Sequence, residues 1–266
     1  MVRNIAVILA VASSAILAGA ASIDKRIVKG ENAKEGDFPF MVSVWSDRGQ
    51  CGGVLLDNTT VLTAAHCLPR KGNKTSFRVG TLDRLSGGVE IKVKTYKRHP
   101  DYRRTSGPIG ETKGEYPKSD IAILKLATPV EESDKIGYAK LPANGSDPAP
   151  NTVALAAGWG VQTVKMLQGL KVADKLAKVA VTVHARDKCL RDNWDPTGID
   201  QIICAGGDDG KDTCRGDSGG PLIDQATGEL IGITAMSLDD CFKGSPGLYT
   251  SVSHFLPYIE ENLGGF

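Results

Sequence analysis

Short runs of β-branched or alternating apolar residues recur between turn residues over most of the chain, and they constrain the fold more than any other feature. The runs lie at 40–45, 53–56, 61–64, 77–79, 89–96, 121–126, 153–157, 179–183, 222–223, 230–235 and 247–252. Strands at this spacing, with no helical period between them, are typical of antiparallel barrels or sandwiches. The 31 glycines and 13 prolines also favour short strands and turns over long helices.

The length of the chain allows either one large all-β domain or two smaller lobes. A chain of 266 residues can bury a substantial core in both cases. The segment 141–151, which carries three prolines, is the best candidate for a crossing between two halves. Near the C-terminus, apolar residues between 252 and 263 recur at helical spacing and predict a short helix.

The N-terminus has the pattern of a secretory signal. A short segment with Arg3 precedes a nearly unbroken apolar run over 5–17, and small residues follow at 18–20. A membrane anchor is the alternative, but the run is shorter than the ~20 residues that a membrane-spanning helix needs. We therefore expect residues 1–20 to be a signal peptide and the mature protein to be soluble, secreted and extracellular.

A second processing site follows the signal. Lys25 and Arg26 stand directly before an apolar Ile27, so a cut after Arg26 would release a propeptide of residues 21–26 and leave a domain of residues 27–266. An ordinary exposed turn with two cations is the alternative interpretation. Residues 1–26 carry three of the 32 basic and one of the 31 acidic residues, so the shortened chain has 29 basic and 30 acidic residues. This net charge of −1 argues against nucleic acid or an anionic membrane as the main partner.

Six cysteines in a secreted chain suggest three disulfides, although spacing alone leaves about 15 pairings open. No Cys-x-x-Cys motif or Cys/His cluster stands at zinc spacing, so we expect no structural metal. Three Asn-x-Ser/Thr motifs, at Asn58, Asn73 and Asn144, are candidate glycosylation sites and fit a secreted surface.

Three fragments carry residues suited to nucleophilic catalysis. His66 lies in Leu-Thr-Ala-Ala-His-Cys, Asp120 in Lys-Ser-Asp-Ile-Ala-Ile-Leu, and Ser218 in Asp-Thr-Cys-Arg-Gly-Asp-Ser-Gly-Gly-Pro. Taken singly, each has another interpretation: a packed or surface histidine, a turn-forming aspartate, and a glycine-rich loop. The three in the order His, Asp, Ser are far more specific. Glycines around Ser218 also allow its backbone N–H groups to point one way, as oxyanion binding requires.

With these fragments, and with Ile-Val-Lys-Gly at 27–30 and Ala-Gly-Trp-Gly at 157–160, the chain resembles the trypsin-like serine proteases of the chymotrypsin family. The resemblance extends from Ile27 to the C-terminus. It implies two six-stranded antiparallel Greek-key β-barrels with a short C-terminal helix and an active site in the cleft between them. His66 and Asp120 would come from the first barrel and Ser218 from the second.

The roles that the resemblance implies follow the family's established mechanism. Ser218 would attack the peptide carbonyl while His66 takes its proton, and Asp120 would hold the imidazole in the required tautomer. The N–H groups of Gly216 and Ser218 would bind the oxyanion. The family needs no cofactor, and its calcium-binding loop is shortened here around 81–90, so calcium is not expected.

The resemblance also assigns residues to specificity and activation. Asp212 would lie at the base of the primary pocket and favour cleavage after Arg or Lys, with Gly247 on the pocket wall. Asp217 would pair with the α-amino group of Ile27 once the bond after Arg26 is cut, which implies an inactive zymogen. Partners would be protein or peptide substrates, an activating protease and possible protein inhibitors of a monomeric enzyme.

By resemblance the cysteines pair as Cys51–Cys67, Cys189–Cys204 and Cys214–Cys241. The family's Ser-Trp-Gly along the substrate strand is replaced here by Ala235, Met236 and Ser237. Ala235 lacks a hydroxyl for the catalytic aspartate, Met236 is a softer wall than an indole, and Ser237 adds a side chain at the pocket mouth.

Two alternatives to an ordinary trypsin-like enzyme stay open because of this departure. One is a catalytically weak or inactive homologue that acts as a protein-binding or inhibitor module. The other is an active protease whose specificity is narrowed by Ser237. The long segment 103–119 before Asp120 either overhangs the substrate cleft or is a mobile insertion.

Overall fold

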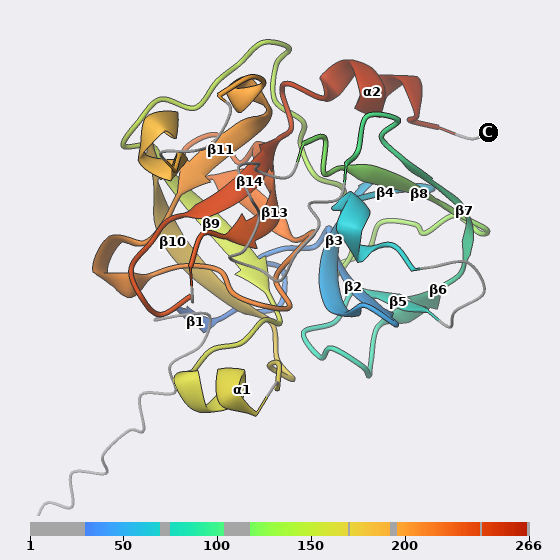
Figure 1. The fold of residues 1–266 in the computed structure, drawn as a ribbon. Helices are drawn as coiled ribbons and strands as arrows, with labels where there is room; N and C mark the ends of the chain where they lie inside the picture. Colours follow the sequence, from blue (N-terminus) through green and yellow to red (C-terminus); the bar gives the residue numbers. More distant parts are fainter. Residues whose placement is uncertain are drawn as a thin grey trace, which may run out of the picture.

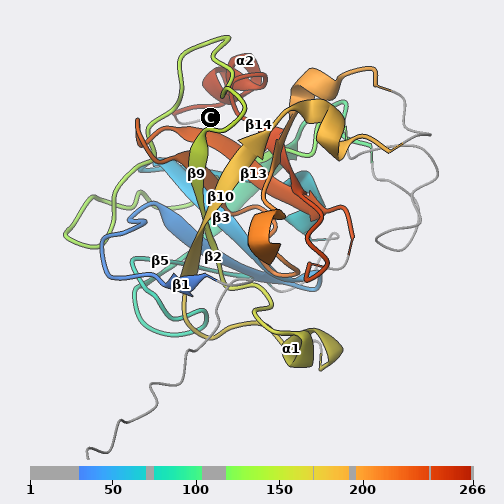
Figure 2. The ribbon, with the colours of Figure 1, turned by 90° about the vertical axis from the view of Figure 1, so that its left-hand side faces the viewer.

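The structure is a computed structural model that describes residues 30–69, 75–103, 118–169, 171–191, 196–239 and 241–264. The described residues form two lobes of antiparallel sheet, seen side by side in Figure 1 and one in front of the other in Figure 2. The expected signal peptide at 1–20, the propeptide at 21–26 and most of the long segment 103–119 lie outside the described residues.

The first lobe is a sheet with the strand order β6-β5-β2-β3-β4-β8-β7. Its members are β2 (Met41–Ser46), β3 (Gly49–Asp57), β4 (Thr60–Thr63), β5 (Ser76–Val79), β6 (Val89–Ile91), β7 (Val93–Arg98) and β8 (Ala122–Leu126). Only Lys92 separates β6 from β7, so these two segments occupy one position and connect the two edges of the sheet. The sheet therefore closes into a barrel of six strands, in which β6 and β7 together count as one.

The second lobe closes in the same way, through a direct pairing of β9 with β10. Its order is β1-β10-β11-β14-β13-β12-β9, and β9 also pairs with β10 over six residue pairs. The strands are β1 (Glu31–Asn32), β9 (Val153–Gly158), β10 (Ala177–His184), β11 (Ile202–Ala205), β12 (Pro221–Asp224), β13 (Leu230–Ser237) and β14 (Gly247–Ser251). Because β1 is attached outside the ring, six strands form the barrel itself.

The two barrels share one topology. Around each ring the first three strands in sequence are neighbours, and the last three follow in reverse order, which returns the chain to the first strand. The pairs formed by strands β1 to β14 are antiparallel in both lobes. The predicted fold class, two antiparallel barrels with a short C-terminal helix, is confirmed.

The helices are short and lie at the margins of the barrels. They are α1 (Val164–Gln168), α2 (Leu256–Glu261) and the 3-10 turns η1 (Ala65–Cys67), η2 (Arg186–Cys189), η3 (Ile199–Gln201) and η4 (Asp208–Gly210). Helix α1 protrudes below the second lobe in both ribbon views. No helix in the described part of the chain is long and apolar enough to cross a membrane.

The two ends of the described chain cross to the opposite lobe. Strand β1 precedes the first barrel in sequence but pairs with β10 of the second. Helix α2 follows the second barrel but packs on the first, where the Tyr258 hydroxyl donates to the Lys97 carbonyl at 2.8 Å (Figure 1). Each lobe is therefore completed by a segment from the other end of the chain.

A second contact joins the two lobes directly. Residues 82–84 of the first lobe lie antiparallel to residues 174–176 of the second, with N–H···O bonds from Arg84 to Asp174 and from Leu176 to Leu82. Two ion pairs, Arg84–Asp174 and Lys175–Asp83, reinforce this contact.

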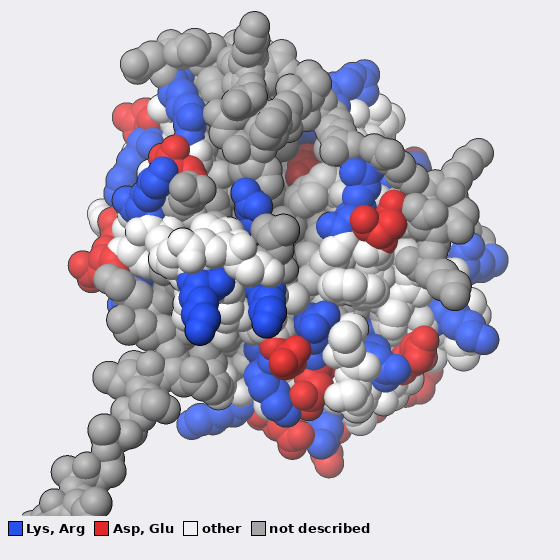
Figure 3. Space-filling model, turned by 60° about the horizontal axis from the view of Figure 1, so that its bottom comes forward, with Lys and Arg blue, Asp and Glu red and all other residues white. Residues whose placement is uncertain are grey.

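On the face shown in Figure 3, basic and acidic side chains are interspersed and form no field of a single sign.

Candidate active site

The structure brings His66 and Asp120 together at the edge of the first barrel. The 3-10 turn η1 buries Ala65 and Cys67 and leaves the ring between them one-third exposed. Nδ1 of His66 lies 2.7 Å from Oδ2 of Asp120, and the backbone N–H of His66 donates to Oδ1 at 2.9 Å. Asp120 is almost fully buried, so the carboxylate fixes both the ring and the backbone of the histidine.

The guanidinium of Arg98 holds the turn that carries His66. Arg98 donates to the carbonyl oxygens of Ala65, Leu68 and Pro69 at 3.0–3.1 Å. The Leu68 and Pro69 carbonyls follow the 3-10 turn, where its short length leaves carbonyls without helical partners, and the Ala65 carbonyl also accepts from the Leu68 N–H at 3.3 Å. Arg98 thereby satisfies the backbone around His66 and orients the turn.

The loop that carries Ser218 belongs to the second lobe but docks on the first. Gly52 of β3 donates its N–H to the Ser218 carbonyl at 2.7 Å, and the sulfur of Cys67 lies 3.5 Å from the same oxygen. Gly219, with φ of +79°, lies so close to the first lobe that a Cβ would collide with the Gly52 carbonyl and the Thr63 hydroxyl. The serine loop therefore lies directly beside the residue that follows His66.

Between Gly216 and Gly220, two backbone N–H groups have no acceptor among the described residues. The N–H groups of Asp217, Gly219 and Gly220 donate to backbone carbonyls at 2.7–3.0 Å. The N–H groups of Gly216 and Ser218 donate to no other described residue. Gly216 has φ of +100° and lies against Val172, so no side chain fits there. These two donors are the pair that the resemblance assigns to the oxyanion.

Asp217 lies fully buried in a cradle of backbone. Its carboxylate accepts hydrogen bonds from the N–H groups of Gly160 at 2.7 Å and Cys214 at 2.8 Å. A Cβ at either Gly158 or Gly160 would collide with its oxygens, which explains the two glycines around the buried Trp159. Burial raises the pKa of Asp217 to about 7, although both hydrogen bonds oppose the shift.

Asp212 is also buried, and only one of its carboxylate oxygens is satisfied. Oδ1 accepts from the N–H of Thr213 at 2.7 Å, while Oδ2 has no hydrogen-bond partner among the described residues. A Cβ on Gly206 or Gly247 would lie 3.0 Å from Oδ1, so glycine on both sides leaves room around the carboxylate. Burial raises the pKa of Asp212 to about 8, and the negative charge of Asp217 adds to the rise.

The departure from the family's substrate strand lies at the end of β13. The Ser237 hydroxyl donates to the Thr213 carbonyl at 3.0 Å, next to Asp212. Ala235 is buried without a polar group, and Met236 is half-buried against Leu248 and its neighbours. Ser237 therefore links β13 to the segment that carries Asp212.

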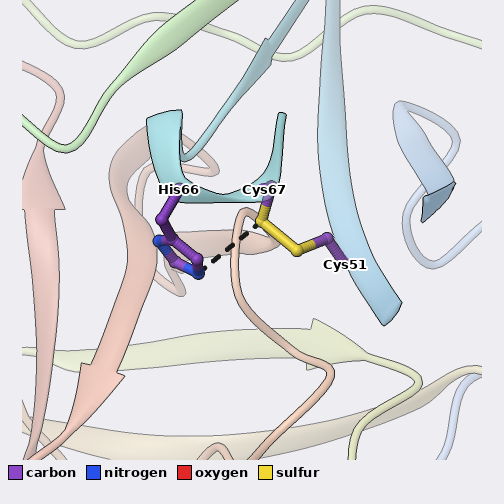
Figure 4. A group of neighbouring side chains, drawn as sticks. All are labelled: Cys51, His66 and Cys67. Atoms are coloured by element: carbon purple, nitrogen blue, oxygen red, sulfur yellow. Dashed lines mark hydrogen bonds between the residues drawn. A yellow bond between two sulfur atoms is a disulfide. The ribbon is translucent and has the colours of Figure 1, made fainter. Parts of the chain in front are cut away.

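Three disulfides join Cys51–Cys67, Cys189–Cys204 and Cys214–Cys241, as the resemblance implies. The first lies beside His66, whose Nε2 is 3.7 Å from the Cys67 sulfur (Figure 4). Among the described residues, Cys51, His66 and Cys67 form the one cluster with metal-ligand spacing. Because both sulfurs are used in the disulfide, the cluster has no thiolate with which to bind a metal.

Of the remaining predicted sites, the structure describes Asn58 and Asn144. Asn58 is half-buried in the turn between β3 and β4, and Asn144 is exposed in the segment between the lobes. Asn73, Arg26 and Ile27 lie outside the described residues. Sequence reasoning did not single out Gln201 and Thr250, which hold the backbone beside Asp120. Neither lies in a recognisable motif, so the sequence carries no signal for them.

Comparisons with known proteins agree with this geometry. Residues 27–259 match the family model for trypsin. Kallikrein 1-related peptidase b11 of Mus musculus is 34% identical over 245 residues, which cover 91% of each chain. Trypsin Blo t 3 of Blomia tropicalis is 33% identical over 241 residues, which cover 88% of this chain and 85% of that protein.

Among solved structures, neuropsin, a serine protease expressed in the limbic system of mouse brain, superposes with a TM-score of 0.74. It is 30% identical, and the alignment covers 90% of this chain and all of neuropsin. The family match spans both barrels and every residue of the candidate site within 27–259. The chain belongs to the trypsin family of serine proteases.

Proposed function

We propose that this protein is a secreted serine endopeptidase, made as a zymogen, that cleaves peptide bonds after Arg or Lys through an acyl-enzyme. The proposed specificity for Arg or Lys rests on one observation. The buried Oδ2 of Asp212 has no partner among the described residues, and glycines stand on both sides of the carboxylate. A guanidinium or ammonium that reached this oxygen would supply the missing hydrogen bonds and charge.

The reaction uses the arrangement of His66, Asp120 and Ser218. A serine hydroxyl is a weak nucleophile at neutral pH, so His66 takes its proton during attack and later returns it to the leaving amine. Asp120 accepts from Nδ1 of His66, which leaves Nε2 as the base and stabilises the imidazolium that forms. The buried position of Asp120 keeps water from competing for this hydrogen bond.

The developing negative charge is held by the serine loop itself. The N–H groups of Gly216 and Ser218, on either side of Asp217, have no acceptor among the described residues. Each such donor lowers the barrier by roughly 3 kcal/mol, because it is oriented before the charge develops. No cofactor takes part.

Activation follows from the burial of Asp217. A carboxylate in a backbone cradle with a pKa raised to about 7 is costly to ionise, and an ammonium group beside it would remove that cost. Cleavage after Arg26 by an activating protease would create such a group at Ile27. If an Arg26→Ala protein kept full activity without cleavage, this activation step would be wrong.

A second candidate function is that of a weak or inactive homologue that binds or inhibits another protein. The observation that favours it is the hydrogen bond between Ser237 and Thr213, which ties together two segments beside Asp212. Ala235 also lacks the hydroxyl that the family places near its catalytic aspartate. Retention of His66, Asp120 and Ser218 favours the enzyme.

One assay separates the two functions. The protein is cut after Arg26 and tested with matched amide substrates that end in Arg, Lys, Phe or Leu, beside a Ser218→Ala control. Turnover of the Arg and Lys substrates alone supports the proposed specificity, and turnover of the others alone contradicts it. If the cut protein turns over no substrate while the new Ile27 terminus is verified, the binding function is favoured.

A further inference from the structure

The backbone around Asp120 makes a tight and unfavourable turn. The N–H of Ile121 donates to the Ser119 carbonyl at 2.8 Å, which places Asp120 at the centre of a three-residue turn. Ser119 has φ of +51°, in the left-handed region that side-chain-bearing residues avoid. Such a conformation persists where neighbouring groups hold it in place.

The group that holds Ser119 comes from the second lobe. Oε1 of Gln201 accepts from the Ser119 N–H at 3.0 Å and lies 3.3 Å from the Ser119 hydroxyl oxygen. Ser119 is buried and Gln201 is half-buried, so water cannot easily replace this acceptor. Gln201 ends the 3-10 turn η3, directly before strand β11.

The second lobe also holds the Asp120 side of the turn, through strand β14. The Thr250 hydroxyl on β14 donates to the Asp120 carbonyl at 3.0 Å. Thr250 pairs with Ile202, the residue that follows Gln201. Gln201 and Thr250 are therefore set side by side by one strand pairing, and together they fix the backbone on both sides of Asp120.

We propose that Gln201 is a positioning residue for catalysis, which orients the Asp120 carboxylate toward His66 by holding Ser119 in its left-handed conformation. This inference rests on the proposed protease function. Support from Gln201 matters more in this chain than in family members with a serine where this chain has Ala235. Alanine offers no hydroxyl to the Asp120 carboxylate. Both described hydrogen bonds to the Asp120 carboxylate come from His66.

The test compares Gln201→Met, which keeps the side-chain length but removes the acceptor, with Gln201→Glu, which restores an acceptor. Gln225→Met is the matched control, since Gln225 is exposed in a turn after β12. We expect Gln201→Met to lower kcat on an Arg amide substrate roughly tenfold with KM changed by less than about twofold. Gln201→Glu should recover most of kcat, and Gln225→Met should match the unmutated enzyme.

A second measurement does not depend on activity. The proton between His66 Nδ1 and Asp120 gives a separate low-field proton NMR signal, which should shift or broaden in Gln201→Met and return in Gln201→Glu. Unchanged kcat and an unchanged signal in Gln201→Met would overturn the inference. If the unmutated protein hydrolyses nothing, the proposed function fails, but the signal still decides the role of Gln201. Should Gln201→Met not fold by near-UV circular dichroism, Gln201→Asn, which withdraws the acceptor by one methylene, takes its place.

Discussion

His66 and Asp120 are joined twice, from Nδ1 to Oδ2 at 2.7 Å and from the backbone N–H to Oδ1 at 2.9 Å. The double contact means that the carboxylate sets both the position of the turn and the tautomer of the ring. A neutral amide in its place could keep the backbone bond but would present a donor to Nδ1.

Asp120→Asn should therefore leave the fold intact and place the His66 proton on the wrong nitrogen. We expect kcat to fall by roughly four orders of magnitude, a value that belongs to the family's established mechanism. The measurement is steady-state hydrolysis of an Arg amide, with Asp101→Asn as an exposed control. A loss of less than tenfold would remove Asp120 from this role.

Asp212→Ser should abolish the proposed preference for Arg and Lys. The serine hydroxyl is neutral, so a guanidinium would enter the pocket without a counter-charge, while the reacting groups stay in place. We expect kcat/KM for the Arg substrate to fall at least about 100-fold, with the Phe substrate little changed or improved. A ratio of Arg to Phe turnover equal to that of the unmutated enzyme would contradict the assignment.

Ser237→Gly should open the pocket. The change removes the hydrogen bond to the Thr213 carbonyl and the side chain that makes it. We expect kcat/KM for Arg and Lys substrates to rise by about tenfold, mainly through a lower KM. If both parameters stay the same, Ser237 does not restrict the pocket.

The stability of the unprocessed protein should fall as the pH rises. Burial raises the pKa of Asp212 from 3.8 to about 8, so between these values the native state binds more protons than the unfolded state. The free energy of unfolding then decreases with pH across this range, and Asp217, with a pKa raised to about 7, acts in the same direction.

This pH dependence is measured by urea unfolding at pH 5 and pH 8 in a Ser218→Ala background, which prevents self-digestion. Asp212→Asn removes one of the two titrating groups, so the loss of stability between the two pH values should be smaller in that variant. An equal loss with and without Asp212 would show that its carboxyl does not have a raised pKa.

Gly219→Ala should separate the serine loop from the first barrel. The new Cβ would collide with the Gly52 carbonyl and the Thr63 hydroxyl, and we expect a stability loss of about 1–3 kcal/mol and at least a tenfold loss of kcat. Gly228→Ala is the matched control, because Gly228 also has a positive φ, +71°, but has open space around it. Equal effects in the two variants would mean that backbone strain, not the collision, is responsible.

The sequence predicts most strands because their apolar runs are long enough to stand out. It does not predict β11, where four residues, Ile202–Ala205, are all buried and show no alternation. It also predicts one strand over 89–96, whereas the structure has β6 and β7 separated at Lys92. The terminal helix is expected over 252–263 and spans Leu256–Glu261.

The candidate site could be predicted only where a motif surrounds it. His66, Asp120 and Ser218 lie in distinctive fragments, but the contacts that hold them come from residues without local patterns. Gln201 reaches Ser119 across the lobe interface, and Thr250 reaches Asp120 in the same way. Such contacts depend on how two barrels dock, which short-range sequence patterns do not encode.

Each end of the described chain is attached to the opposite lobe, and this affects what happens when the chain is cut between the lobes. A single proteolytic cut in the segment 141–151 would give two fragments with no disulfide between them, because each of the three bridges lies within one fragment. The first fragment would still contribute β1 to the sheet of the second, and the second would still cover the first with α2. Neither fragment is a self-sufficient domain, so the nicked protein should persist as a non-covalent pair until it is denatured.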